Sequence, residues 1–96
     1  MDVLVTYDVA TDTPEGRKRL RHVARVCVDY GQRVQKSVFE CSVSEVQYEK
    51  MKQRLLKRID EDEDSLRLYR LQAPKERFIE QFGIDRGIDF HGPLVA

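Results

Sequence analysis

The sequence predicts an α+β fold in which two helices cover one face of an antiparallel sheet. Two observations lead to this prediction. The chain has 96 residues, and a chain of that length forms one domain because hydrophobic cores seldom divide below roughly 250 residues. Along it, β-rich and helix-patterned segments follow in the order strand, helix, bent β-rich segment, helix, strand, which is typical of a two-layer sandwich.

The first strand and the first helix have clear sequence signals. Residues 3–9 are β-branched or aromatic at nearly every position, which predicts a mid-sheet strand covered on both faces. A helix is expected over residues 14–30, because Thr13 can cap it and Pro14 suits its first position. Gly31 is expected to end it in a left-handed conformation. The apolar stripe of this helix comprises Leu20, Val23, Ala24, Cys27 and Tyr30.

The segment 33–43 is β-rich, but its apolar positions change parity between Val38 and Phe39. A bend, a bulge or a very tight hairpin near Lys36 and Ser37 would explain this break. If the segment supplies two strands, the fold is the ferredoxin-like βαββαβ sandwich, with both helices on one face of the sheet.

A second helix and a further strand are expected after the β-rich segment. A helix is expected over residues 44–59, with Ser44 and Gln47 forming a capping box. The acidic run 60–64 would oppose the helix dipole, so the helix is expected to end before it. We interpret the run as a solvated turn, or alternatively as a repulsive fence that keeps nucleic acid on the basic face. The last core strand is marked by Leu66, Leu68, Tyr69 and Leu71.

The domain organisation follows from these elements. Residues 1–73 are expected to form the ferredoxin-like core, and residues 74–96 a tail for dimer or partner contacts that is not a separate domain. The tail is too apolar to stay solvated and too short to fold alone. A second copy of the chain is one candidate for the surface that it covers.

Location and metal content are predicted from what the sequence lacks. There is no leader pattern at the start and no apolar stretch of membrane-spanning length, so we expect a cytoplasmic protein with no membrane contact. Cys27 and Cys41 have no ligand-type spacing and are expected to be buried, reduced thiols.

The charge is balanced overall but not locally. Seventeen Lys and Arg residues match seventeen Asp and Glu residues, yet residues 14–36 carry a net charge of +5. Within that region Arg17, Arg21 and Arg25 form a row at four-residue spacing, and such like-charged pairs destabilise a helix slightly. The row is either an ordinary solvated face or a groove for a phosphate backbone.

Asp8 is a carboxylate at the end of an otherwise apolar strand. It is either a cap, a loop acceptor or a salt-bridge partner, or it is a ligand for a divalent ion. One carboxylate is a poor magnesium site, but a residue near a two-fold axis meets its own copy. Two copies of Asp8 could hold an ion that activates water against a phosphodiester.

These features together resemble the CRISPR-associated protein 2 family. The resemblance is carried by the strand that ends in Tyr7, Asp8 and Val9, by the basic start of the following helix, and most specifically by the segment 31–41, which reads GQRVQKSVFEC. The helix 44–59, the strand around residues 64–69 and the tail segment 78–83 continue the resemblance over nearly the whole chain.

The resemblance implies a homodimer in which the last strand adds to the partner's sheet. It also implies a role in CRISPR spacer acquisition in a prokaryotic cytoplasm, with the integrase, CRISPR-associated protein 1, and the duplex to be inserted as partners. Many members are described as magnesium-dependent endonucleases on single-stranded RNA or double-stranded DNA. By position, Asp8 matches the catalytic, metal-binding residue. Arg17, Arg19 and Arg33 match basic residues, and Tyr7, Ser37 and Phe39 belong to the matching cleft segments.

Two functional hypotheses follow. In the first, Asp8 of both protomers binds magnesium, and Arg17, Arg19, Arg21, Arg25 and Arg33 hold the phosphates of the nucleic acid that is cleaved. In the second, the protein is a non-catalytic scaffold that grips a duplex backbone without reading bases.

Overall fold

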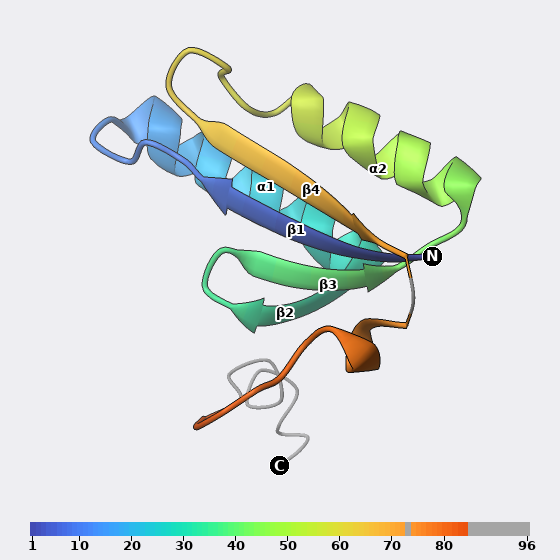
Figure 1. Ribbon diagram of the computed structural model, residues 1–96. Helices are drawn as coiled ribbons and strands as arrows, with labels where there is room; N and C mark the ends of the chain where they lie inside the picture. The colour runs from blue at the N-terminus through green and yellow to red at the C-terminus, as the bar shows by residue number, and fades with distance from the viewer. Residues whose placement is uncertain (73, 85–96) are drawn as a thin grey trace.

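The computed structural model describes residues 1–72 and 74–84 of the chain. A four-stranded sheet with the order β2-β3-β1-β4 carries two helices on one face (Figure 1). In chain order the elements are β1 (Asp2–Asp8), α1 (Pro14–Tyr30), β2 (Gly31–Gln35), β3 (Val38–Ser42), α2 (Glu45–Leu56), β4 (Ser65–Leu71) and a 3₁₀ turn, η1 (Lys75–Arg77). All three strand pairs are antiparallel. The predicted ferredoxin-like sandwich is confirmed.

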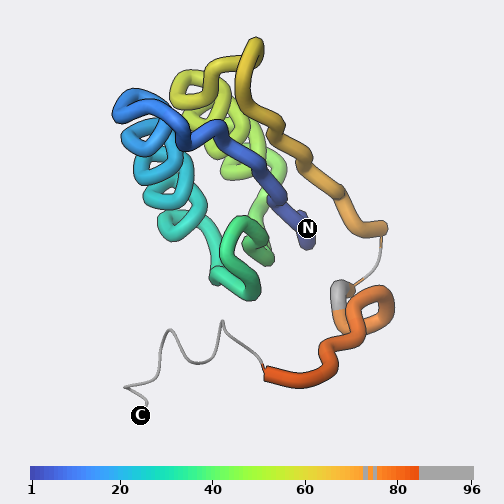
Figure 2. The backbone as a smooth tube through the Cα atoms, turned by 90° about the vertical axis from the view of Figure 1, so that its left-hand side faces the viewer, coloured from blue at the N-terminus to red at the C-terminus, as the bar shows by residue number. Residues whose placement is uncertain are grey.

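The bent β-rich segment is a tight hairpin. Strands β2 and β3 are joined by a two-residue turn at Lys36 and Ser37, and their register shifts between Arg33 and Gln35. The change of parity in the sequence is a change of face, because Val34 and Val38 line the open side of the sheet whereas Phe39 is buried in the core. The helices lie side by side behind this sheet, as the side view shows (Figure 2).

Both predicted helix starts are confirmed by their caps. Thr13 Oγ1 accepts a hydrogen bond from the Gly16 backbone N–H at 3.0 Å, and Pro14 is the first helical residue. Ser44 and Gln47 form the expected capping box, with distances of 3.1 and 2.8 Å. Helix α2 ends at Leu56, three residues before the predicted end.

The predicted left-handed end of α1 is wrong. Gly31 is extended, with φ −161°, and is the first residue of β2. A side chain there would collide with Cys41 and the backbone of Glu40. Glycine is therefore needed because β2 runs close against β3, and not because of its own dihedral angles.

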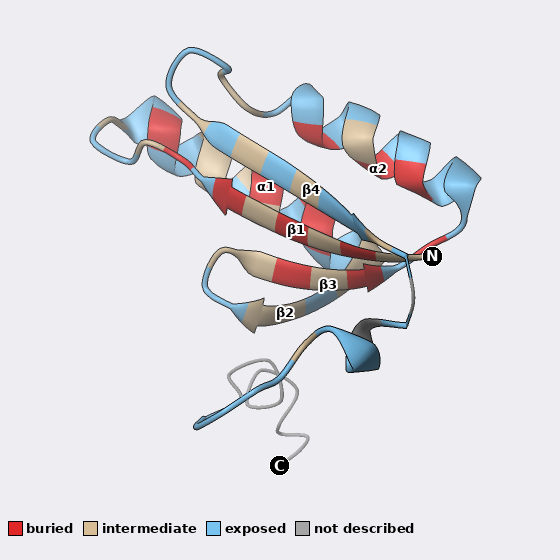
Figure 3. Ribbon diagram, in the orientation of Figure 1, coloured by how far each residue is buried: buried red, intermediate tan, exposed pale blue. Residues whose placement is uncertain are grey.

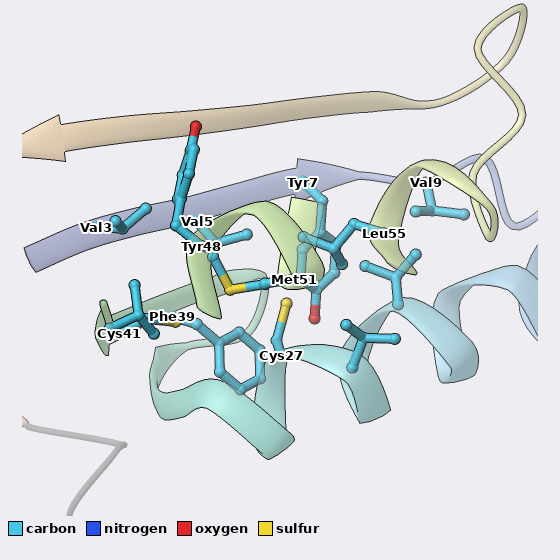
Figure 4. Close-up of a cluster of buried hydrophobic side chains, with 13 residues drawn as sticks. Val3, Val5, Tyr7, Val9, Cys27, Phe39, Cys41, Tyr48, Met51 and Leu55 are labelled. Atoms are coloured by element: carbon cyan, nitrogen blue, oxygen red, sulfur yellow. The ribbon is translucent and has the colours of Figure 1, made fainter. Parts of the chain in front are cut away.

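The core lies between the sheet and the helices. Thirteen buried residues form it: Val3, Val5, Tyr7, Val9, Val23, Val26, Cys27, Phe39, Cys41, Val43, Tyr48, Met51 and Leu55. Figure 4 shows how side chains of β1, β3 and both helices meet in this layer. Both cysteines are free thiols inside it, as expected.

The other face of the sheet is only partly covered. Along β1 buried residues alternate with half-buried ones such as Leu4 and Thr6 (Figure 3), so the prediction that both faces of this strand are covered is wrong. The physical reason is that a run of β-branched residues also suits an antiparallel strand with one open face.

The described part of the tail returns toward this open face. Leu4, Val38 and Ile79 are among the residues that line a cavity of about 360 Å³ between the sheet and the tail. Phe78 and Phe82 nevertheless remain 60% and 81% exposed. Residues 78–84 form no strand, and residues 85–96 of the predicted exchanged segment lie outside the described residues.

Neither helix in the part of the chain that the structure describes has the length and apolar character that bilayer crossing requires.

The buried carboxylate of Asp64 connects the loops at one end of the sandwich by hydrogen bonds. The Asp64 side chain is 0% exposed and binds Arg19 Nε at 2.8 Å and Nη2 at 3.2 Å. It also accepts hydrogen bonds from the backbone N–H groups of Ala10 at 3.1 Å and Asp60 at 2.8 Å. The Arg19 guanidinium holds the pKa of Asp64 below its ordinary value of 3.8, and the two N–H groups act in the same direction while burial opposes them.

The core makes a direct prediction for α2. Leu55 is 0% exposed and Leu56 is 44% exposed, so the two neighbours form a matched pair. Leu55→Ala should lower the free energy of unfolding by about 2 to 5 kcal/mol, because it leaves a cavity that the core cannot fill. Leu56→Ala should change it by less than about 1 kcal/mol. Urea denaturation measures both, and equal effects would contradict the packing described.

The Asp64 interactions predict a pH-dependent contribution to stability. Because the folded pKa lies below 3.8, the contribution is complete above that pH and is lost as the pH falls through the folded value. Near neutral pH, Asp64→Asn should therefore lower Tm by at least about 5 °C. The difference from wild type should shrink in acid.

Asp62→Asn is the control, because Asp62 is exposed in the same turn. Thermal denaturation monitored by circular dichroism from neutral pH to acid checks both variants. An Asp64→Asn curve parallel to that of the wild type at every pH would contradict the role of the charge.

Candidate metal and nucleic-acid site

Asp8 ends β1 and is exposed at the edge of the sheet. Its Cα register partner on β4 is Ser65. No hydrogen bond or ion pair joins its carboxylate to another residue within 1–72 and 74–84, so the cap and salt-bridge interpretations are not observed there. The carboxylate is therefore available to a ligand from outside this chain.

Three segments surround Asp8 at this edge. The hairpin turn lies beside β1, since Ser37 O accepts a hydrogen bond from Tyr7 N at 3.1 Å. The loop after β1 is held two residues later, at Ala10, by Asp64. From the first turns of α1, Arg17 Nη1 donates to Thr11 O in that loop at 3.1 Å. The end of β1 that carries Asp8 lies at the left in Figure 1, next to the loop that Arg17 contacts.

A site for a divalent ion at the end of β1 would be strongest with one carboxylate from each of two chains. Among the described residues, no group of three or more His, Cys, Asp or Glu side chains is arranged to hold a metal ion. Asp64 is occupied by Arg19 and two backbone N–H groups, which leaves Asp8. Magnesium in proteins takes one or two carboxylates, with water and phosphate oxygens completing its shell. Two copies of Asp8 would satisfy that requirement.

Tyr7 and Phe39, predicted as cleft residues, lie in the core of the single chain. They are 6% and 0% exposed, and their rings stack with centroids 6.3 Å apart. Burial raises the pKa of the Tyr7 hydroxyl, Cys27 raises it further, and the Arg33 guanidinium lowers it. In the chain alone these two side chains support the Asp8 edge from inside, whereas Ser37 is half-buried in the turn beside it.

Arg33 is placed differently from an ordinary surface arginine. Its guanidinium carbon lies 5.1 Å from the centroid of the Phe39 ring, which is the geometry of a cation–π contact. The side chain therefore packs on the core while it bears a charge near the β2–β3 hairpin. Its predicted role with phosphates stays a prediction.

Arg19 is engaged within the chain. Its bidentate contact with Asp64 leaves the side chain 19% exposed, so Arg19 stabilises the fold at this end. A charged side chain in a pair of this kind is poorly available to a phosphate backbone. The role that the resemblance implies for Arg19 is not supported by this placement.

Arg21 and Arg25 are exposed on the outer face of α1. Neither makes an ion pair with any residue that the structure describes. Arg17 is also exposed but contacts the loop next to Asp8. Arg21 and Arg25 are thus available to bind phosphates. Arg17, the first member of the predicted row, instead contacts the loop that follows Asp8.

Asp64 is the residue that the sequence interpretation missed. It stands in the run predicted to be a solvated turn, and that prediction holds for the exposed residues 61–63. The available signal was its position as the last acid before a strand that pairs beside Asp8. The fence hypothesis for the run is untested.

Comparison with protein families and known structures agrees with this architecture. The family model for CRISPR associated protein Cas2 matches residues 1–77. The "CRISPR-associated endoribonuclease Cas2 1" of Moorella thermoacetica is 60% identical over 95 residues, which cover 99% of each chain. The "CRISPR-associated endonuclease Cas2" of Halalkalibacterium halodurans is 50% identical over the same length, also with 99% of each chain covered.

A solved structure supports the fold independently. The crystal structure of Streptococcus pyogenes Cas2 at pH 6.5 superposes with a TM-score of 0.78 at 60% sequence identity, covering 86% of this chain and all of that one. The resemblance in sequence is confirmed. The chain belongs to the CRISPR associated protein Cas2 family.

Proposed function

We propose that this protein acts in CRISPR spacer acquisition as a homodimer that binds a nucleic-acid backbone and hydrolyses phosphodiester bonds with the help of magnesium. The observation that carries the proposal is the carboxylate of Asp8, which is exposed at the end of a central strand and has no hydrogen-bond or ion-pair partner among the residues that the structure describes. Two relatives are named as an endoribonuclease and an endonuclease, which agrees with such chemistry.

The chemistry at Asp8 depends on two protomers. Magnesium bound by Asp8 from each chain would lower the pKa of a bound water and neutralise charge on the phosphate. Asp8 itself has the task of holding the ion at a fixed place. Its backbone is well suited to this, because β1 is hydrogen-bonded on both sides and the following loop is held at Ala10.

The basic residues would contribute affinity rather than sequence recognition. Arg21 and Arg25 are long, charged and exposed on one helix face, and phosphate contacts of this kind position a duplex without reading its bases. Substrates of either kind, single-stranded RNA or a DNA duplex, offer the same backbone chemistry.

The homodimer and the integrase are the proposed protein partners. The half-covered sheet face and the exposed Phe78, Phe82 and Ile84 supply apolar surface that a second chain would bury, and this supports exchange of the tail between protomers. The integrase, CRISPR-associated protein 1, is the partner proposed for the assembled dimer with its duplex in a prokaryotic cytoplasm.

A non-catalytic scaffold is the second candidate function. The observation that favours it is the donor set of one carboxylate per chain, beside an arginine row that needs no metal to bind phosphate. In this case the dimer would grip the duplex, and Asp8 would not be required for spacer acquisition.

Asp8→Asn tests the catalytic proposal. The variant keeps the size of the side chain but loses the charge that binds a cation. Cleavage of labelled single-stranded RNA and duplex DNA with added magnesium should fall at least about 100-fold. Circular dichroism should show an unchanged fold, because Asp8 is exposed.

Asp12→Asn is the matched control, since Asp12 is an exposed carboxylate in the loop that follows β1. It should cleave like the wild type. Full activity of Asp8→Asn would show that the cleavage comes from a contaminant. The scaffold function would then remain, and a spacer-acquisition assay with the same variant would test it.

Duplex binding should depend on the α1 row. For the Arg21→Ala, Arg25→Ala double variant, the slope of log K against log salt concentration should become shallower by about 2, because each phosphate contact releases roughly one counterion. Fluorescence anisotropy without magnesium measures the slope. Lys52→Ala, which removes a charge paired with Glu49 at 3.2 Å on α2, is the control. An unchanged slope in the double variant would show that these two arginines of α1 do not contact the duplex.

A further inference from the structure

The two helices meet at an unusual pair of side chains. Arg58, just after α2, approaches His22 of α1, with Nη1 and Nδ1 3.4 Å apart. An arginine can only donate, so the contact requires an unprotonated Nδ1 and hence a neutral ring. A proton on Nδ1 would end this contact and bring two cations together.

The charged groups that lower the pKa of His22 are all cations. Those that act on His22 come from both sides of the helix seam: Arg58, Lys18, Arg21 and Arg25. None of the four forms an ion pair with a residue in the described ranges. Burial lowers the pKa of His22 first, and the four positive charges lower it further.

Two carboxylates near these helices bind other arginines. Asp29, seven residues after His22 on α1, binds Arg54 of α2 at 2.8 Å. Asp64 binds Arg19, also at 2.8 Å. Arg58 itself stands two residues before the acidic run 60–64, yet its guanidinium turns to the basic helix.

We propose that the seam between α1 and α2 is a second phosphate-binding site, in which Lys18, His22 and Arg58 hold one backbone phosphate of a nucleic acid more tightly when His22 is protonated. The identity of the ligand rests on the proposed function. The site itself rests on the concentration of like charges, which an anion would relieve.

A phosphate fits the chemistry of these three side chains. An arginine fork binds two phosphate oxygens, a lysine adds a point charge, and a protonated imidazole donates from a ring nitrogen. With the phosphate in place, His22 no longer needs to accept from Arg58. Binding and protonation then favour each other, because the anion stabilises the imidazolium.

The site would extend the arginine row of α1 across to the other helix. Arg21 and Arg25 share the outer face of α1 with Lys18, so a backbone lying on that face would reach the seam at Arg58. The sequence could not reveal this arrangement, because 36 residues separate His22 from Arg58.

Duplex binding as a function of pH tests the proposal. Fluorescence anisotropy with the full chain and a short labelled DNA duplex, without magnesium, is compared at about pH 6 and about pH 8, where histidine changes its charge. The wild type should bind about three- to tenfold more tightly at the lower pH.

His22→Gln separates this site from other titrating groups. Glutamine keeps a hydrogen-bond acceptor for Arg58 but cannot take up a proton. At both pH values the variant should bind the duplex with the affinity that the wild type shows at the higher pH. Most of the pH dependence should therefore be lost. His91, the other histidine of the chain, is unchanged in this variant.

Arg58→Ala tests the second side chain. It should weaken binding at both pH values and reduce the salt slope by about 1, whereas Lys52→Ala should leave the pH dependence unchanged. Unfolding curves of each variant, recorded beside the binding data, separate a loss of contact from a loss of structure.

The possible outcomes distinguish the seam site from the proposed function. If the wild type binds the duplex but His22→Gln and Arg58→Ala bind with the same affinity, pH dependence and salt slope, the seam site is disproved and the proposed function stands. If the wild type binds no duplex at any pH, the nucleic-acid function fails together with the site. Asp12→Asn, at an exposed carboxylate outside both sites, should retain the pH-dependent binding in full.

Discussion

The carboxylate of Asp64 is the interaction on which the Asp8 edge of the molecule depends. Through one fully buried side chain it connects the loop after β1, the first half of α1 and the turn before β4. A buried charge is tolerated only when its partners are complete, and here one guanidinium and two backbone N–H groups supply them. This fixes the position of Ala10 and so the exit of the chain from Asp8. The rigidity of the candidate site therefore comes from a residue that is not part of it.

The same interaction explains why the role of each arginine could not be predicted from the sequence alone. Arg17, Arg19 and Arg21 stand within five residues and carry the same charge. In the fold, Arg19 points to Asp64, 45 residues away, Arg17 lies on a loop carbonyl and Arg21 is exposed. Periodicity assigns a residue to a helix face but says nothing of what a neighbouring element brings to that face. Arg33 illustrates this as well, since its cation–π contact depends on the pairing of β2 with β3.

The fold was predictable because its signals are local. The capping residues Thr13 and Ser44, the stripe of α1 and the change of parity in the hairpin each depend on residues less than about one element apart. Errors occurred where a local pattern has two physical explanations. A run of β-branched residues suits either a fully covered strand or one with an open face, and a glycine after a helix serves either a left-handed turn or a close approach of strands. Gly31 takes the second option because Cys41 lies against it.

The cations on and near the two helices fall into a paired group and an unpaired group. Arg19, Arg54 and Arg70 each have a carboxylate partner, namely Asp64, Asp29 and Glu45, so these pairs need no ligand. The remaining cations on the outer face of α1 and at its seam with α2 have no such partner among the described residues, although the protein has equal numbers of acids and bases. Within the part of the chain that the structure describes, these pairs leave Arg21, Arg25 and Arg58 without an ion-pair partner near the helices, and Asp8 without one at the end of β1. A neutral protein can present a strongly basic surface in this way, because its surface potential depends on which charges are paired and not on their sum.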